Sequence, residues 1–262
     1  MKTLQLFVVA LAVSFATPMY AQTADEIINN YFENTGGEDN WRMIEGITMH
    51  AKINQGGMEI PLEITRLKNG KQMTVINLQG QVFKQGVYDG ETFWGMNFQT
   101  MKAEKNDAET TANLKTQLND FPDPFLDYKE KGYTVELMGK EEMDGTECFK
   151  IMLEMEPITV DGKEEKSISY YFFDTENFVP IVIQSEIKQG QAKGMISEVT
   201  MSDYQEVGNV YMPFSMTQGV KGQPGQPITM DKIELNPTID DKEFMFPDDT
   251  AEEKKDDNEN KN

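Results

Sequence analysis

The chain has 262 residues, of which 45 are acidic and 24 are lysine or arginine, so its formal net charge is -21 at pH 7. So acidic a chain is repelled by nucleic acid phosphates and anionic lipid surfaces, which argues against binding either through a basic patch. The single cysteine, Cys148, excludes an intramolecular disulfide, and the single histidine, His50, leaves too few nitrogen and sulfur ligands for a zinc site.

The first 21 residues have the pattern of a secretory signal peptide. Lys2 precedes an apolar run from Leu4 to Ala16, and the small residue Ala21 stands before Gln22. The run is short for a membrane span, and no later segment could serve as one. Cleavage after Ala21, with no cysteine there for a lipid anchor, predicts a soluble periplasmic protein without a transmembrane segment.

The segment that follows opens with a predicted helix. Thr23 and Glu26 form a capping box, Ile27, Ile28, Tyr31 and Phe32 share one face, and Gly36-Gly37 ends the helix. A second short helix is expected over 38–45, with Trp41 towards the same side.

Alternating strands separated by short turns follow from Gly46 onward. Asn69-Gly70, Asp89-Gly90, Asp144-Gly145 and Asp161-Gly162 are typical hairpin turns. A helix over 106–118 interrupts this meander, and Phe121-Pro122-Asp123-Pro124-Phe125 breaks that helix. About eleven strands are expected, enough for a large curved sheet, so the fold class is α+β with one antiparallel sheet.

The domain boundaries follow from these patterns. No interior linker divides residues 22–247, so we predict a single domain there. Residues 248–262 are rich in acidic and lysine side chains and lack large apolar ones, which predicts a disordered acidic tail.

No catalytic motif accompanies these elements. His50 stands in a predicted strand without a Gly-x-Ser-x-Gly turn, and Cys148 has no histidine near it in sequence. We therefore expect neither an enzyme nor a bound metal or cofactor, with a secreted hydrolase as a third option behind the two described below.

Three segments resemble the LolA-like, outer-membrane lipoprotein-sorting family of periplasmic proteins. They are Ala24-Asp25-Glu26-Ile27-Ile28 with Gly36-Gly37, the stretch from Tyr88 to Trp94, and the closing stretch from Asn236 to Pro247. The resemblance implies a half-open β barrel covered by the N-terminal and inserted helices, with an apolar concave face that shelters acyl chains. It also implies an arginine on the sheet that holds a helical lid, and Arg42 and Arg66 are the only arginines in the chain.

Methionine and aromatic side chains on the predicted strands and helices could line such a cavity, because methionine adapts to varied apolar partners. The same residues could equally fill an ordinary core. If the sheet curls around a cavity, Phe32 and Trp41 on the helices would meet Trp94 and Phe98 across its mouth. The predicted lining is Phe32, Trp41, Met73, Trp94, Met96, Phe98, Leu114, Leu118, Phe121, Phe125, Met212, Phe214 and Met216.

Two functions from different classes fit these features. The first is a non-enzymatic periplasmic carrier of lipid or lipoprotein acyl chains, which would exchange cargo with a membrane-bound donor or acceptor protein. The second is a sensor or interaction module on the same scaffold, which would bind a protein partner.

Overall fold

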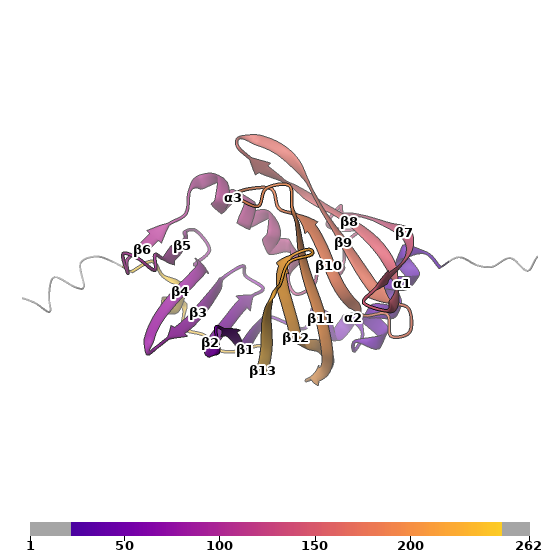
Figure 1. Cartoon of the computed structure of the whole chain (residues 1–262), viewed down its shortest axis with the longest axis horizontal. Helices are drawn as coiled ribbons and strands as arrows, with labels where there is room; N and C mark the ends of the chain where they lie inside the picture. The colour runs from indigo at the N-terminus through magenta and orange to yellow at the C-terminus, as the bar shows by residue number, and fades with distance from the viewer. Residues whose placement is uncertain (1–21, 248–262) are drawn as a thin grey trace, which may run out of the picture.

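The computed structural model describes residues 22–247, which form one curved sheet with helices on its inner side (Figure 1). The predicted signal peptide, 1–21, and the predicted acidic tail, 248–262, lie outside the described residues.

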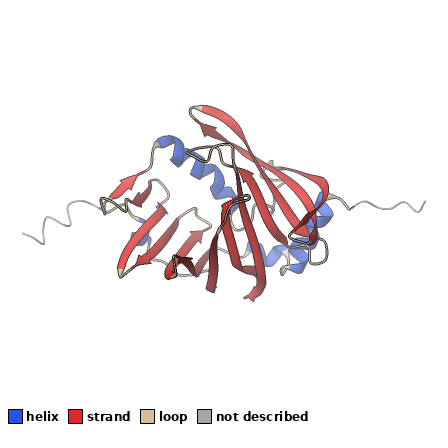
Figure 2. Cartoon of the chain, viewed as in Figure 1, coloured by secondary structure: helices blue, strands red, loops and turns tan. Residues whose placement is uncertain are grey.

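Strand residues dominate the described chain, and all strands pair into one antiparallel sheet of thirteen (Figure 2). The sheet confirms the predicted fold class, with thirteen strands in place of about eleven. The sequence did not predict β6, because its three residues are too few to show an apolar alternation. The strands are β1 (Gly46–Gln55), β2 (Met58–Leu67), β3 (Gln72–Leu78), β4 (Gln81–Tyr88), β5 (Phe93–Met96), β6 (Ala103–Lys105), β7 (Thr134–Met143), β8 (Thr146–Val160), β9 (Lys163–Asp174), β10 (Pro180–Glu186), β11 (Ile196–Val207), β12 (Val210–Val220) and β13 (Gln226–Leu235).

The sheet is built from two meanders that meet at β1 and β13. Strands β1 to β6 follow one another on one side of this seam, and β13 back to β7 follow on the other. The seam keeps Ile47 opposite Leu235 and Met49 opposite Ile233. We call the two sides the N-terminal arm and the C-terminal arm. Strands β6 and β7 end the sheet without pairing to each other. The curved sheet is therefore an open trough and not a closed barrel.

Two short helices open the described chain, as expected. In α1 (Ala24–Asn34), Thr23 and Glu26 form the predicted capping box. Helix α2 (Glu38–Arg42) is shorter than the predicted 38–45. Between them Gly36 has a positive φ, and a β carbon there would lie 2.0 Å from the Asn209 carbonyl oxygen, so only glycine permits this contact.

Helix α3 (Ala108–Gln117) and the 3₁₀ turn η1 (Leu118–Asp120) connect β6 to β7, close to the predicted 106–118. Asp107 caps α3 by accepting a hydrogen bond from the Thr110 amide. Because β6 and β7 lie at opposite ends of the sheet, this connection must cross from one arm to the other (Figure 1).

The main core lies between the inner face of the sheet and the cover formed by α1, α2 and the segment 121–133. Phe32 and Trp41 from the helices, Phe125 from the segment and Phe173 from β9 are all buried in it. Aromatic rings interlock here, with Phe125 edge-on to Tyr171 at 4.7 Å and to Phe173 at 5.5 Å. This part of the trough is filled.

A second core lies on the other face of the N-terminal arm. Trp94 and Met73 pack there against Phe244, which belongs to the C-terminal turn η2 (Asp241–Phe244). The Trp94 indole donates a hydrogen bond of 3.0 Å to the Phe244 carbonyl, and Phe246 meets the indole edge-on. The closing segment thus covers part of the outer face of the N-terminal arm.

Candidate functional site

The inner face of the sheet carries apolar side chains in line across neighbouring strands, which start in the main core at Ala51 and Met230 and continue over the N-terminal arm. Residues that pair across antiparallel strands point to the same face, so the pairing register gives these rows directly. One row is Met216, Ile228, Ile53 and Ile60. The next is Met230, Ala51, Leu62, Ile76 and Phe83.

We call these two rows the inner wall. Several of its members are only partly buried, among them Met216, Ile228, Leu62 and Ile76. Apolar side chains aligned over several strands and left partly uncovered offer a surface to an apolar partner.

Helix α3 lies over the inner side of the sheet, and its hold on the two arms differs. On the C-terminal arm, the Asn113 side chain accepts from the Thr159 amide at 2.8 Å and donates to the Thr159 carbonyl at 2.6 Å. Glu109 accepts from the amides of Asp161 and Gly162 in the same β8–β9 turn. These four hydrogen bonds tie α3 to the β8–β9 hairpin.

The contacts of α3 with the N-terminal arm are apolar. Leu114 is the one buried residue of the helix, and Leu118 in η1 packs at Gly70 of the β2–β3 turn. No hydrogen bond joins a side chain of α3 to β2, β3 or β4 within the part of the chain that the structure describes. The helix is therefore fixed at one arm and rests on the other.

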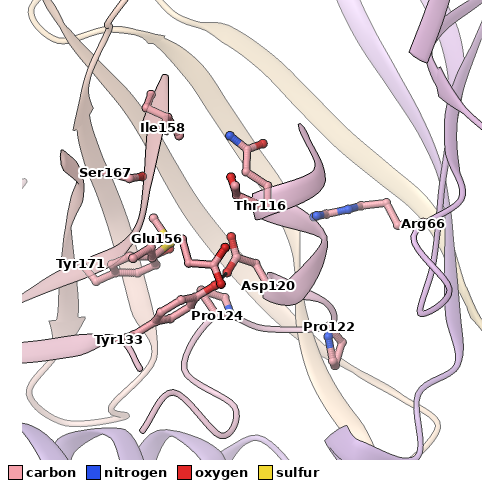
Figure 3. Close-up of a pocket in the computed structure, with 12 residues that line it drawn as sticks. Arg66, Thr116, Asp120, Pro122, Pro124, Tyr133, Glu156, Ile158, Ser167 and Tyr171 are labelled. Carbon is pink, nitrogen blue, oxygen red and sulfur yellow. Dashed lines mark hydrogen bonds between the residues drawn. The ribbon is translucent and has the colours of Figure 1, made fainter. Parts of the chain in front are cut away.

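Two hollows flank α3. The first, of about 250 Å³, lies towards the C-terminal arm among Asp120, Tyr133, Glu156 and Tyr171, and we call it the Tyr133 hollow (Figure 3). The second, of about 320 Å³, lies towards the N-terminal arm and is lined in part by Ile64, Gln72, Thr74 and Leu114; we call it the Thr74 hollow. Arg66 and Gln117 line both hollows, so the two meet beneath the end of α3.

Arg66 reaches from β2 towards α3 at this meeting point, as Figure 3 shows. Desolvation lowers the pKa of its guanidinium, with the Asp120 carboxylate as an opposing, longer-range influence. Among residues 22–247 no ion pair or hydrogen bond holds Arg66. Its position under the C-terminal end of α3 is favourable for a cation because of the helix dipole.

Arg42 lies in a different setting. Its guanidinium is exposed and pairs with Glu38 at 2.6 Å and with Asp127 at 2.6 Å, tying α2 to the segment 121–133. Of the two arginines that the sequence offered as a lid latch, Arg66 is the one on the sheet and beside α3.

Carboxylates are buried where η1 leads into the segment 121–133. Burial raises the pKa of Asp123 to about 6, although its carboxylate accepts hydrogen bonds from the Tyr31 hydroxyl and the Phe125 amide. Burial also raises the pKa of Asp120, which accepts a hydrogen bond of 2.8 Å from the Tyr133 hydroxyl.

The two residues considered for catalysis lie elsewhere. Burial raises the pKa of the Cys148 thiol to about 11, which keeps it protonated and unreactive. His50 is partly exposed on the outer face of the seam, 3.2 Å from Glu63 and 3.5 Å from Glu234. Between Gln22 and Pro247, no group of three or more metal-ligating side chains comes together.

The structure brings one group of the predicted lining residues together at the main core. Phe32, Trp41, Phe125 and Met212 are buried in it, and Phe121, Phe214 and Met216 pack against it while partly buried. Of these, Met216 also belongs to the inner wall. Leu114 and Leu118 lie at α3, over the N-terminal arm.

A second group lies on the outer face, away from both hollows for the most part. Trp94, Met96 and Met73 belong to the second core, on the outer face of the N-terminal arm. Met73 also borders the Thr74 hollow. Trp94 therefore does not meet Phe32 and Trp41 across a mouth. Phe98 does not belong to this group: it is 52% exposed and lies against Phe83 of the inner wall, with tilted rings whose centroids are 4.8 Å apart. Contact of any of these thirteen side chains with a ligand stays a prediction.

Sequence reasoning missed the continuous part of the inner wall, chiefly Ile53, Leu62, Ile76, Phe83 and Ile228. Each was visible as an apolar residue in an alternating strand, but their alignment depends on the register across β13, β1, β2, β3 and β4, which pairs residues far apart in sequence.

Solved structures similar to this chain include three bacterial proteins. A DUF1329 family protein from Desulfovibrio piger has 14% sequence identity over 84% of this chain and 96% of that chain, with a TM-score of 0.51. A LolA superfamily protein from Nitrosomonas europaea has 13% identity over 86% and 98%, with a TM-score of 0.49. A protein described as an outer membrane lipoprotein-sorting domain, from Vibrio parahaemolyticus, has 11% identity over 84% and 94%, with a TM-score of 0.47.

The chain shares its fold with the Desulfovibrio piger protein, and a LolA superfamily protein and a lipoprotein-sorting domain, the family that the sequence resembles, are among the solved structures found similar to it. No family model and no curated protein matches the sequence. Within residues 22–247, no helix is both long and apolar enough to cross a membrane.

Proposed function

We propose that this protein is a non-enzymatic periplasmic carrier that binds an acyl chain of a lipid or lipoprotein between α3 and the inner wall. The observation that carries the proposal is the difference between the two parts of the trough. Interlocked side chains fill the part under α1 and α2, whereas the part under α3 holds two hollows beside a partly covered apolar wall.

The sizes and the energies agree with such a ligand. Hollows that bind small molecules are typically about 300–1,000 Å³. The Thr74 hollow, about 320 Å³, lies within that range, and the Tyr133 hollow, about 250 Å³, which meets it at Arg66, lies just below. Moving an acyl chain out of water is worth about 0.8 kcal/mol per CH₂. Covering the exposed parts of Leu62, Ile76 and Met216 would add to that gain.

The asymmetric hold on α3 gives the carrier a way to open. The helix can lift from Ile64 and Gly70 on the N-terminal arm while Asn113 and Glu109 keep it on the β8–β9 hairpin. Arg66, beneath the end of the helix, is the residue that we propose favours the closed position.

Two substitutions on the same hairpin, one on each face, test the proposal. Ile76→Asp places a carboxylate in the inner wall, whereas Val82→Asp places one on the outer face of β4, where the valine is already 52% exposed. Binding of N-phenyl-1-naphthylamine, an apolar fluorescent probe, should weaken about tenfold or more in Ile76→Asp, equal to about 1.4 kcal/mol or more. It should be unchanged in Val82→Asp, with circular dichroism confirming the fold of both.

Native mass spectrometry of the gently purified protein gives an independent reading. Co-purified lipid supports a carrier. No lipid, together with no probe binding by the unmodified protein, would overturn it. Under that outcome, a pull-down that returned one stoichiometric protein would favour the interaction module instead.

A further inference from the structure

Arg66 is a cation whose side chain has no partner among residues 22–247, in a chain with a large excess of acid. The other arginine, Arg42, contacts Glu38, Asp39 and Asp127 within 3.4 Å. Arg66 pairs with no carboxylate among the described residues, although it is less exposed to water than a surface side chain. Removing a guanidinium from water without a counter-charge costs free energy. An anion bound beside Arg66 would offset this cost, so its binding is favoured.

The surroundings of Arg66 differ on its two sides. Towards the C-terminal arm, the Tyr133 hollow contains the carboxylates of Asp120 and Glu156, which repel an anion. Towards the N-terminal arm, Arg66 is the sole charged residue that lines the Thr74 hollow. Gln72, Thr74 and Gln117 add uncharged side chains that can donate hydrogen bonds there.

The Thr74 hollow continues into the inner wall. Ile64 and Thr74, which pair across β2 and β3, line the hollow, and Leu62 and Ile76 pair two residues further along the same strands. Residues two apart in a strand point to the same face, about 7 Å from each other. A charged group at Arg66 can therefore be continuous with a hydrocarbon chain on Leu62, Ile76 and Phe83.

Resting on the proposed carrier function, we propose that the cargo is an amphiphile with a compact anionic headgroup, a carboxylate or a phosphate, which Arg66 binds in the Thr74 hollow. The planar guanidinium offers two parallel N–H donors that match either group. The acyl chain then lies along the inner wall.

Titration calorimetry with four probes separates the headgroup from the chain. Dodecanoate and dodecyl phosphate carry the anion on a twelve-carbon chain, dodecanamide carries the same length without charge, and inorganic phosphate carries the charge without the chain. We expect at least one of the two anionic amphiphiles to bind about tenfold or more tightly than dodecanamide, because hydrogen bonds to charged groups are the stronger ones. The tighter of the two identifies the headgroup.

Variants assign the effect to Arg66. In Arg66→Gln the advantage of the anionic probe over dodecanamide should disappear, in Arg66→Lys it should be partly retained, and in Arg42→Gln it should be unchanged. The two Arg66 variants are expected to fold because the Arg66 side chain pairs with no described residue, and Arg42→Gln removes only exposed ion pairs. Circular dichroism checks all three. The comparison of anionic and neutral probes on the unmodified protein needs no variant.

The failures of the two proposals are distinguishable. Equal affinity for dodecanoate, dodecyl phosphate and dodecanamide would overturn the anionic headgroup and leave the carrier standing. Binding of inorganic phosphate as tight as that of dodecyl phosphate would overturn the amphiphile. Absence of binding by all four would count against the carrier itself.

Discussion

Among single residues, Asp123 has a carboxyl group whose pKa the fold raises far enough to be tested by a change of pH. Its carboxylate accepts hydrogen bonds from the Tyr31 hydroxyl and the Phe125 amide, and burial raises its pKa from 3.8 to about 6. A group whose folded pKa lies above its unfolded pKa stabilises the fold most when protonated. That stabilisation is complete below about pH 4 and is lost as the pH rises through 6.

Asp123→Asn should therefore remove a pH-dependent part of the stability. Asparagine does not titrate, so the variant lacks this pH dependence. Between pH 4 and pH 7 the unmodified protein should lose up to about 3 kcal/mol of unfolding free energy relative to the variant. Urea denaturation of both proteins at the two pH values measures this. Asp127→Asn is the matched control: Arg42 lowers the pKa of Asp127, so that substitution should shift the difference in the opposite direction. Parallel profiles for Asp123→Asn and the unmodified protein would contradict the assignment.

Among the elements, α3 is held in place mainly by side-chain hydrogen bonds to another element and only slightly by burial of its own residues. It buries one residue, Leu114, and its four hydrogen bonds to the β8–β9 turn come from Glu109 and Asn113. Elements with few buried contacts open locally at a low cost in free energy. The side-chain anchors therefore control how often α3 leaves the sheet.

Asn113→Ala should loosen α3 without unfolding the sheet. The change removes two of the four hydrogen bonds, each worth about 0.5–1.5 kcal/mol, so amide hydrogen exchange over 108–117 should accelerate about tenfold or more. Association of the apolar probe should quicken as well. Asn119→Ala, which removes one exposed contact with Glu156, serves as the control and should leave both rates near those of the unmodified protein. Equal exchange in all three proteins would show that Asn113 does not hold the helix.

The local elements were predictable because their signals are local. The Thr23–Glu26 capping box, the Asn69-Gly70 turn and the prolines after Leu118 act within a few residues, and the structure contains the helix, the hairpin and the break that they predict. Alternation within a strand indicates which residues share a face, and Trp94 and Met96 of β5 do lie together in the second core.

Which face lies inside the trough could not be read from that alternation. Trp94 belongs to the second core because Phe244, 150 residues later, packs against it there. The inner wall needed the same long-range knowledge, since its rows exist only once β1 pairs with β13. Arg66 was one of two candidates for the latch until the fold placed it beneath α3.

At the scale of the whole molecule, charge and apolar surface are separated. The chain carries a net charge of -21, whereas the inner wall has no ionisable side chain and the Thr74 hollow has one charged residue, Arg66. An acidic carrier is repelled by an anionic membrane at distances up to the Debye length, about 30 Å at about 0.01 M salt and about 3 Å at about 1 M. The same charge keeps loaded molecules apart from one another.

Transfer of a neutral ligand from this protein to vesicles should therefore depend on lipid charge and on salt. With N-phenyl-1-naphthylamine as the ligand, transfer to vesicles containing phosphatidylglycerol should be about tenfold slower than to pure phosphatidylcholine at about 0.01 M salt. At about 1 M salt the two rates should converge, because screening removes the repulsion but leaves the apolar partition of the probe unchanged. Stopped-flow fluorescence measures both rates, with the free probe as the control for partition alone. If lipid charge made no difference at low salt, the probe would be leaving through water before it meets a membrane, and delivery would then depend on opening of α3 alone.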